Sequence, residues 1–247
     1  MKQWLAILLL CCAALAQSPS PLFIATAANL GGAFQRIADL FTASNHVPVE
    51  LILGASGNLA EQIRRGAPFD AFAAANPVFI DRLIAEGLLV ASTYTIVAHG
   101  RLVLFQLDDT VPVVEDLADL GDPAIQFVAI ADPLVAPFGQ AALQALERAG
   151  VLAAVQPKLV FGSNIQDALQ LVLSGNADVT INALSAVLDF QRRGRLSLLP
   201  AELHDPILQV AAVVAESPRQ DEARAFLRFL SSEPAQEVLA EFGLVVR

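Results

Sequence analysis

Short apolar stretches alternate with helix-like patterns along most of this 247-residue chain. The stretch 22–28, for example, is followed by apolar residues at Leu30, Phe34, Ile37 and Phe41, a spacing typical of one helix face. Strands are predicted at 22–28, 47–53, 70–75, 127–131, 158–161 and 178–182, and helices at 30–43, 59–65, 77–86, 139–148, 165–173, 184–192, 219–230 and 234–242. This alternation predicts an α/β protein whose mixed, mostly parallel sheets carry helices on both faces.

Two longer β-rich stretches, 94–107 and 207–215, interrupt the alternation. They bracket a central α/β block, which predicts two lobes joined by two crossing strands. Lobe I is expected to comprise residues 17–98 and 208–247, and lobe II residues 99–207. The hinge is expected near 98–101 and 208–210. A ligand is then expected in the cleft, at the carboxyl ends of the strands.

The N-terminus has the pattern of a secretory signal peptide. Lys2 is followed by thirteen uncharged residues at 4–16, which is short for a bilayer span, and Ala14-Leu15-Ala16 fits the small-residue cleavage pattern. We therefore expect residues 1–16 to be removed and the mature protein to be periplasmic. The alternatives are a lipid anchor at Cys11 or Cys12 and an uncleaved anchor. No later stretch is long and apolar enough to cross a membrane.

Charge excludes several classes of partner. The chain has 15 Lys and Arg against 25 Asp and Glu, a formal net charge of −10. Such a balance predicts no nucleic-acid binding and no attraction to an anionic membrane surface. Hydrophobic residues make up 55% of the chain, which is ample for a core. The only two cysteines lie in the predicted signal peptide, so the mature chain is expected to fold without a disulfide bond.

Four turns share one design, in which a strand meets small or polar residues and then a helix. They are Ala27-Ala28-Asn29-Leu30, Gly54-Ala55-Ser56-Gly57-Asn58, Ala136-Pro137-Phe138-Gly139 and Gly162-Ser163-Asn164-Ile165. Helix starts leave backbone N–H groups without partners and carry partial positive charge, so four of them facing one cleft would bind an anion. Taken singly, Asn29, Ser56 and Asn164 also fit ordinary helix caps, and Gly57 and Gly139 fit turn glycines.

Several segments carry a resemblance to a known family. They are IATAANL at 24–30, LILGASGNLAEQI at 51–63, GAPFDAFAAAN at 66–76, ADPLVAPFGQAAL at 131–143 and SGNADVTINALS at 174–185. Over nearly the whole mature chain the sequence resembles the periplasmic molybdate-binding proteins of ABC importers, within the type II substrate-binding fold. The resemblance implies a monomeric protein that captures molybdate or tungstate, closes around it and delivers it to a membrane permease.

The resemblance also assigns the oxyanion contacts. It implies Asn29 with Ala28 beside it, Ser56 through its hydroxyl and N–H, and Phe138 and Ile165 through their N–H groups. Many members of the family have serine where this chain has Asn29. Others have a hydroxyl-bearing aromatic residue at the position of Phe138 or a tyrosine at that of Ala183. No cofactor is implied, and no residue is expected to bind a metal directly, because the molybdenum is coordinated by its own oxygens.

The residue chemistry suits a fully deprotonated dianion. Molybdate and tungstate carry no proton at neutral pH, so a suitable pocket needs only hydrogen-bond donors. Hydrogen phosphate would need an acceptor, yet none of the four turns has Asp or Glu at its contacting position. The nearest carboxylates are Asp132, expected to fix its turn, and Asp167, expected in the first turn of a helix. Sulfate, like molybdate and tungstate, needs only hydrogen-bond donors, so the size of the pocket decides between sulfate and these larger anions.

Enzyme chemistry has little support in the sequence. His46, His99 and His204 lie in unrelated contexts without metal-ligand spacing, Ser56 lacks the G-x-S-x-G pattern, and no phosphate-binding G-x-x-x-x-G-K is present. We therefore predict a binding protein and not an enzyme.

Two alternative functions stay open. One is a binder of another oxyanion or a small organic anion, held by an arginine such as Arg64, Arg65 or Arg101; the other is an exported sensor for a histidine kinase.

Overall fold

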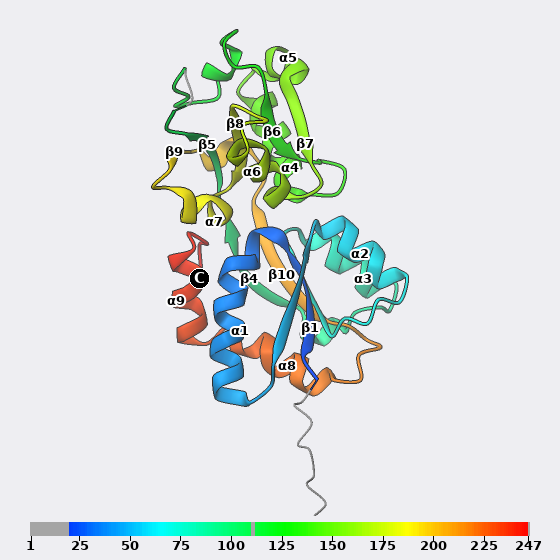
Figure 1. The fold of residues 1–247 in the computed structure, drawn as a ribbon. Coiled ribbons are helices and arrows are strands. Elements are labelled where there is room, and N and C mark those ends of the chain that lie inside the picture. Colours follow the sequence, from blue (N-terminus) through cyan, green and yellow to red (C-terminus); the bar gives the residue numbers. More distant parts are fainter. Residues whose placement is uncertain (1–19, 110–111, 247) are drawn as a thin grey trace, which may run out of the picture.

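The computed structural model describes residues 20–109 and 112–246, and these form two α/β lobes stacked end to end (Figure 1). The predicted signal peptide at 1–16 lies outside the described residues. The strands are β1 (Leu22–Ala27), β2 (Val49–Gly54), β3 (Ala71–Ala74), β4 (Thr95–Gly100), β5 (Leu102–Leu107), β6 (Val128–Ala131), β7 (Leu159–Gly162), β8 (Val179–Ala183), β9 (Gly194–Leu198) and β10 (Ile207–Val213). Among the described residues, no helix is long and apolar enough to span a membrane.

Each lobe is built on a five-stranded mixed sheet. Lobe I contains the sheet β2-β1-β3-β10-β4 and lobe II the sheet β7-β6-β8-β5-β9. Within each sheet the βα repeats pair in parallel, as in β1 with β2 and β6 with β7, because a helix returns each strand in the same direction. The antiparallel pairs involve β10 in lobe I and β5 in lobe II. The predicted α/β architecture with mixed sheets is confirmed, but the sheets are not mostly parallel, because the pairs made by β10 and β5 are antiparallel and equal the parallel pairs in number.

The chain passes between the lobes twice. The β-rich stretch predicted at 94–107 is two strands in different sheets, because β4 ends at Gly100 and β5 begins at Leu102. The return passage leads from β9 to β10, and β10 pairs antiparallel with β4 (Figure 1). A register irregularity between Gln209 and Val210 interrupts that pairing. Such a bulge bends the strand and re-aims a side chain.

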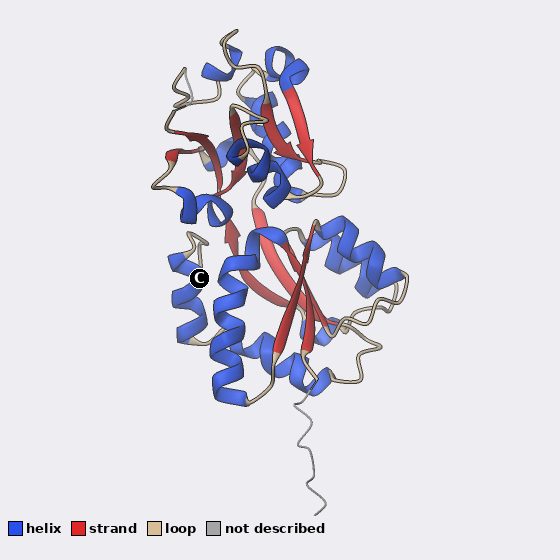
Figure 2. Ribbon diagram, in the orientation of Figure 1, coloured by secondary structure: helices blue, strands red, loops and turns tan. Residues whose placement is uncertain are grey.

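Helices flank both sheets (Figure 2). They are α1 (Gly31–Asn45), α2 (Ser56–Arg64), α3 (Pro77–Ala85), α4 (Pro137–Arg148), α5 (Leu152–Val155), α6 (Ile165–Leu173), α7 (Leu184–Val187), α8 (Gln220–Phe229) and α9 (Glu233–Glu241). The prediction of one helix over 184–192 was wrong. The segment is α7 followed by the 3₁₀ turn η5 (Leu188–Phe190), and the chain then joins the sheet as β9, which the alternation did not reveal.

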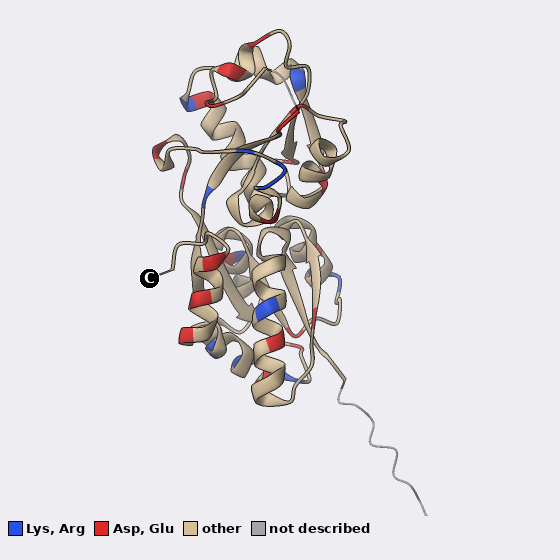
Figure 3. Ribbon diagram, turned by 60° about the vertical axis from the view of Figure 1, so that its left-hand side comes forward, with Lys and Arg blue, Asp and Glu red and all other residues tan. Residues whose placement is uncertain are grey.

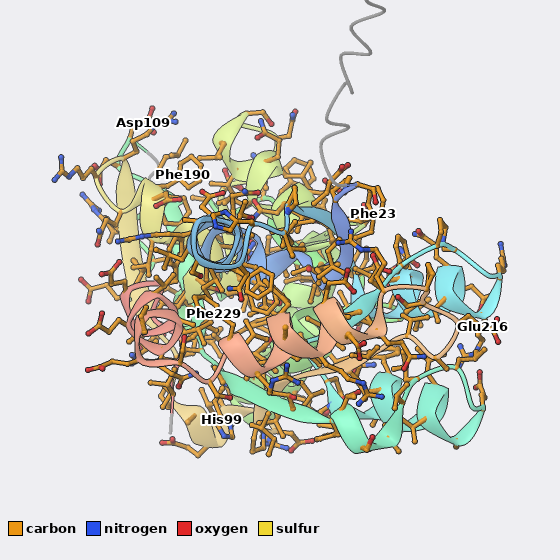
Figure 4. All side chains as sticks on the ribbon, turned by 90° about the horizontal axis from the view of Figure 1, so that it is seen from below. Phe23, His99, Asp109, Phe190, Glu216 and Phe229 are labelled. Carbon is orange, nitrogen blue, oxygen red and sulfur yellow. The ribbon has the colours of Figure 1, made fainter. Side chains whose placement is uncertain are left out.

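Aromatic packing anchors the helices of lobe I. The ring of Phe226 on α8 makes edge-to-face contacts with Phe34 and Phe41 on α1, with centroids 6.1 and 5.3 Å apart. Phe229, labelled in Figure 4, contacts Phe41 in the same way. Each such pair contributes about 0.5–1.5 kcal/mol beyond the burial of its area. Asp70 holds local structure in the same lobe, because its carboxylate accepts hydrogen bonds from the Phe23 N–H and the Ser217 hydroxyl.

Candidate functional site

The four predicted turns converge on one small cavity between the lobes. Its lining residues are Ala27, Ala28, Asn29, Gly54, Ala55, Ser56, Ala75, Ala136, Pro137, Phe138, Asn164 and Ile165. The space open to the centre of a water molecule is about 10 Å³, enough for roughly one water. All five residues that the resemblance assigned, Ala28, Asn29, Ser56, Phe138 and Ile165, lie on this wall, and all five are buried.

Ser56 is the first residue of α2. Ala55 occupies the N-cap position, so Ser56 does not cap its own helix. Its Oγ instead accepts a hydrogen bond of 3.0 Å from the Ala75 N–H, which leaves the hydroxyl proton free to donate. The next N–H, that of Gly57, donates to the Val135 carbonyl in lobe II at 2.9 Å. The Ser56 N–H has no partner among the described residues and lies at the cavity wall.

The α4 turn also offers a single N–H to the cavity, and proline is the reason. Pro137 is the first residue of α4 and has no N–H to offer. Phe138 follows, and its N–H finds no partner in the described part of the chain. Gly139 comes next, and a Cβ there would lie 2.1 Å from the Ala131 carbonyl oxygen. Only glycine allows the helix to start this close to the end of β6.

At the α6 turn, the Asn164 side chain caps two backbone N–H groups and leaves that of Ile165 unpaired. The Asn164 Oδ1 accepts hydrogen bonds from the Gln166 and Asp167 N–H groups at 2.8 and 3.1 Å. Asn164 is thus an N-cap, as its ordinary interpretation predicted. The Ile165 N–H has no partner within the described residues and lies at the cavity wall.

The first turn differs from the other three. It begins with a 3₁₀ helix, η1 (Ala28–Leu30), and α1 follows directly. The alternative that Asn29 is a simple cap is wrong, since its side chain makes no capping bond. Its Nδ2 donates instead to the Oε1 of Gln209 at 3.1 Å, and its carbonyl accepts from the Ser185 hydroxyl at 2.8 Å.

The cavity wall carries no ionisable side chain. Small apolar residues surround the donors, and one apolar cluster joins Ala28 and Ala55 of lobe I to Phe138 and Ile165 of lobe II. In such dry surroundings a hydrogen bond to a charge is stronger than in water. Charged residues are distributed over both lobes (Figure 3). The described residues also contain no group of three or more His, Cys, Asp or Glu that could hold a metal ion.

Shifted pKa values occur away from the cavity. Hydrogen bonds from Arg64 lower the pKa of Glu86, and hydrogen bonds from Arg148 and Gln144 lower that of Asp205. These residues do not line the cavity. The two carboxylates nearest to the turns have structural partners, because Asp132 accepts from the Leu134 N–H and Asp167 from the Ser163 hydroxyl.

Two neighbours of the site were missed by sequence analysis. Gln209 is fully buried in β10 and bonded to Asn29, and Ser185 is buried at the start of α7. Gln209 had a detectable signal, since it is the only polar residue in the apolar stretch 207–215. Ser185 had none, because nothing local indicates that its hydroxyl reaches the other lobe. Ala183, where some family members have a ligand-contacting tyrosine, is fully buried and does not line the cavity.

The lack of ionisable lining groups predicts pH-independent anion binding. We expect the Kd for molybdate or tungstate, dianions without a proton in this range, to change less than about twofold between about pH 6 and pH 9, because no lining residue gains or loses charge there. Isothermal titration calorimetry at several pH values checks this. A tenfold change would mean that a titrating group faces the ligand.

Comparison with known proteins places the chain in a family. Residues 22–245 match the family described as bacterial extracellular solute-binding protein. The chain belongs to this family. Among curated relatives of this solute-binding protein, the molybdate-binding protein ModA of Rhodobacter capsulatus is 33% identical, covering 94% of this chain and 91% of the relative. ModA of Azotobacter vinelandii is 34% identical, with coverages of 95% and 92%.

Solved structures agree with this assignment. The periplasmic molybdate-binding protein of Azotobacter vinelandii superposes with a TM-score of 0.85 at 26% identity, covering 92% of this chain and 99% of that one. The sulfate-binding protein SubI of Mycobacterium tuberculosis has a TM-score of 0.79 at 20% identity, covering 91% and 86%, and shows the shared fold alone. The resemblance to molybdate-binding proteins found in the sequence is thus confirmed for this solute-binding protein.

Proposed function

We propose that this solute-binding protein captures molybdate or tungstate between its lobes and delivers it to an ABC permease. The observation that carries the proposal is a cavity wall that offers unpartnered hydrogen-bond donors and carries no carboxylate or other ionisable side chain. Ser56, Phe138 and Ile165 each bring one backbone N–H without a protein partner to its wall, and the Ser56 hydroxyl adds a further donor. The names of the curated relatives and of the superposed structure support molybdate as the ligand.

A wall of hydrogen-bond donors without a carboxylate selects among oxyanions by their protonation state. A tetrahedral dianion without a proton can accept a hydrogen bond at every oxygen. Hydrogen phosphate carries one proton, which would face a wall without a carboxylate and lose its hydrogen bond to water. Helix N-termini favour the negative charge without a cationic side chain, so an acidic protein can hold a dianion.

The proposal includes the two predicted lobes, residues 17–98 with 208–247 and residues 99–207. Closure would occur about the crossing strands near 98–101 and 208–210, where β10 carries its bulge. We propose that the protein acts as a periplasmic monomer after removal of residues 1–16, without a cofactor and without catalysis. The permease would recognise the closed form.

The arginines considered for binding a small organic anion are paired elsewhere or lie away from the cavity wall. Arg64 is paired with Glu86 and Glu61, and Arg65 with Glu61. Arg101 does not line the cavity. A carboxylate ligand would therefore meet no guanidinium at this wall.

Calorimetric titration of the protein lacking residues 1–16 tests the proposal. Calorimetry suits this chain because its single Trp, Trp4, lies in the predicted signal peptide. We expect molybdate and tungstate to bind with submicromolar Kd, and sulfate and phosphate to give no heat at the same concentrations. Tighter binding of phosphate than of molybdate, or no binding of any of the four anions, would overturn the proposal.

A further inference from the structure

Three hydrogen bonds join the turns of the cavity directly across the cleft. Each links a ligand-side turn of lobe I to lobe II through protein atoms. The Ser185 hydroxyl donates to the Asn29 carbonyl at 2.8 Å, the Gly57 N–H to the Val135 carbonyl at 2.9 Å, and the Gln166 Nε2 to the Ala28 carbonyl at 3.4 Å. None of the three uses a donor that the proposed function assigns to the oxyanion.

The bond of Ser185 is the best placed of the three. Both residues are buried, with exposed fractions of 9% for Ser185 and 3% for Asn29, so water competes little for either group. Ser185 lies on α7, and α7 packs against η1 and α1 in lobe I. Its partner is the backbone of a residue assigned to the ligand, so the bond fixes the position of the first turn as well as the distance between the lobes.

The Gly57 contact shows how closely the lobes meet. A Cβ at Gly57 would lie 3.0 Å from the Val135 carbonyl oxygen and 3.1 Å from its Cα. The bond of Gln166 is longer, and its side chain is exposed, so it contributes less. Ser185 therefore supplies the one buried side-chain donor among these three bonds, and a substitution can remove it without altering the backbone.

We infer that Ser185 is a positioning residue that holds the lobes closed through Asn29 independently of the ligand. The inference rests on the proposed function only for its effect on affinity. Because an apparent Kd rises as the binding-competent fraction falls, loss of this bond weakens binding without removing a ligand contact. The oxyanion and the Ser185 bond then favour the same closed state through different atoms.

Distance measurement between the lobes tests the inference without any anion. The chain has no cysteine after Cys12, so Ser44→Cys on α1 and Ala153→Cys on α5 give one labelled pair in the protein lacking residues 1–16. Electron–electron resonance of spin labels at these sites reports the populations of closed and open forms. We expect the empty parent protein to populate the closed distance, and Ser185→Ala to lower the closed-to-open ratio about two- to twelvefold, as for one hydrogen bond.

Matched variants separate closure from ligand contact. Ser56→Ala should weaken molybdate binding but leave the empty protein's distances unchanged. Ser174→Ala, which removes an exposed hydroxyl of lobe II, should change neither, and Gln166→Ala should shift the distances in the direction of Ser185→Ala but less. Thermal melting checks that each variant is folded.

The outcomes distinguish this inference from the proposed function. Unchanged distances in empty Ser185→Ala, or no closed population in the empty parent, would overturn the role of Ser185. A shifted distance distribution in Ser185→Ala together with no binding of molybdate by the parent would support Ser185 and reject the oxyanion. The molybdate Kd of Ser185→Ala should increase by a factor no larger than the factor by which its closed fraction decreases.

Discussion

Replacement of Gly139 by alanine is expected to damage both stability and ligand binding. The new Cβ would lie 2.1 Å from the Ala131 carbonyl oxygen and 2.9 Å from its carbonyl carbon, and neither backbone atom can rotate away. Relief requires the start of α4 to move, at a cost of about 1–3 kcal/mol in the free energy of unfolding. The Phe138 N–H moves with it, and loss of its bond to a dianion weakens binding by roughly 10- to 150-fold.

Gly121→Ala is the matched control. A Cβ at Gly121 meets nothing within 4 Å, and its φ does not require glycine. Urea unfolding followed by circular dichroism gives the free energies, and calorimetry with molybdate gives the Kd values. Equal stability and equal Kd in the two variants would show that α4 can shift without disturbing the site.

Ser56→Ala is expected to weaken oxyanion binding by roughly 1.5–3 kcal/mol, the value for a hydrogen bond to a charged group. That range corresponds to an increase in Kd of roughly 10- to 150-fold. The substitution also leaves the N–H of Ala75 without its partner Oγ in the buried wall, so the free energy of unfolding should fall by about 1–3 kcal/mol.

A titration of Ser56→Ala beside Ser44→Ala measures this effect. Ser44 lies exposed near the end of α1, where its hydroxyl donates to carbonyls of its own helix and accepts from the neighbouring Asn45 amide. Ser44→Ala should retain the parent Kd. If Ser56→Ala also retained it, the Ser56 hydroxyl would have no role in binding, although its N–H could still contact the ligand.

Much of the site could be predicted because it is made of local sequence patterns. A helix start after a short turn leaves N–H groups without partners wherever the pattern occurs, so the four turns could be identified without coordinates, and the family resemblance then singled out Ser56, Phe138 and Ile165 within them. Asn164 is an N-cap as its residue type indicates. The helix at 165–173 matches α6 in both bounds, since an N-cap and a clear apolar period define its ends.

What could not be predicted depends on contacts between distant segments. Asn29 has the residue type of a cap, yet its amide bonds to Gln209, 180 positions away. Ser185 reaches a carbonyl 156 positions away. The helix predicted at 184–192 is replaced by α7 and a 3₁₀ turn, and β9 then pairs with β5; the polar–apolar alternation of β9 covers only residues 195–198, too short a pattern to predict a strand on its own. Tertiary pairing overrides local preference in each case.

The small volume of the cavity has a kinetic consequence. In this closed arrangement the cavity has room for roughly one water molecule, so an oxyanion can enter or leave only when the turns of α2 and α4 separate. Every oxyanion must then enter through the same opened form, so association rates should be similar for anions of equal charge. Anions would then differ in their residence times. A preferred ion dissociates slowly because its contacts stabilise the closed form, and a weakly bound ion dissociates when the lobes next open.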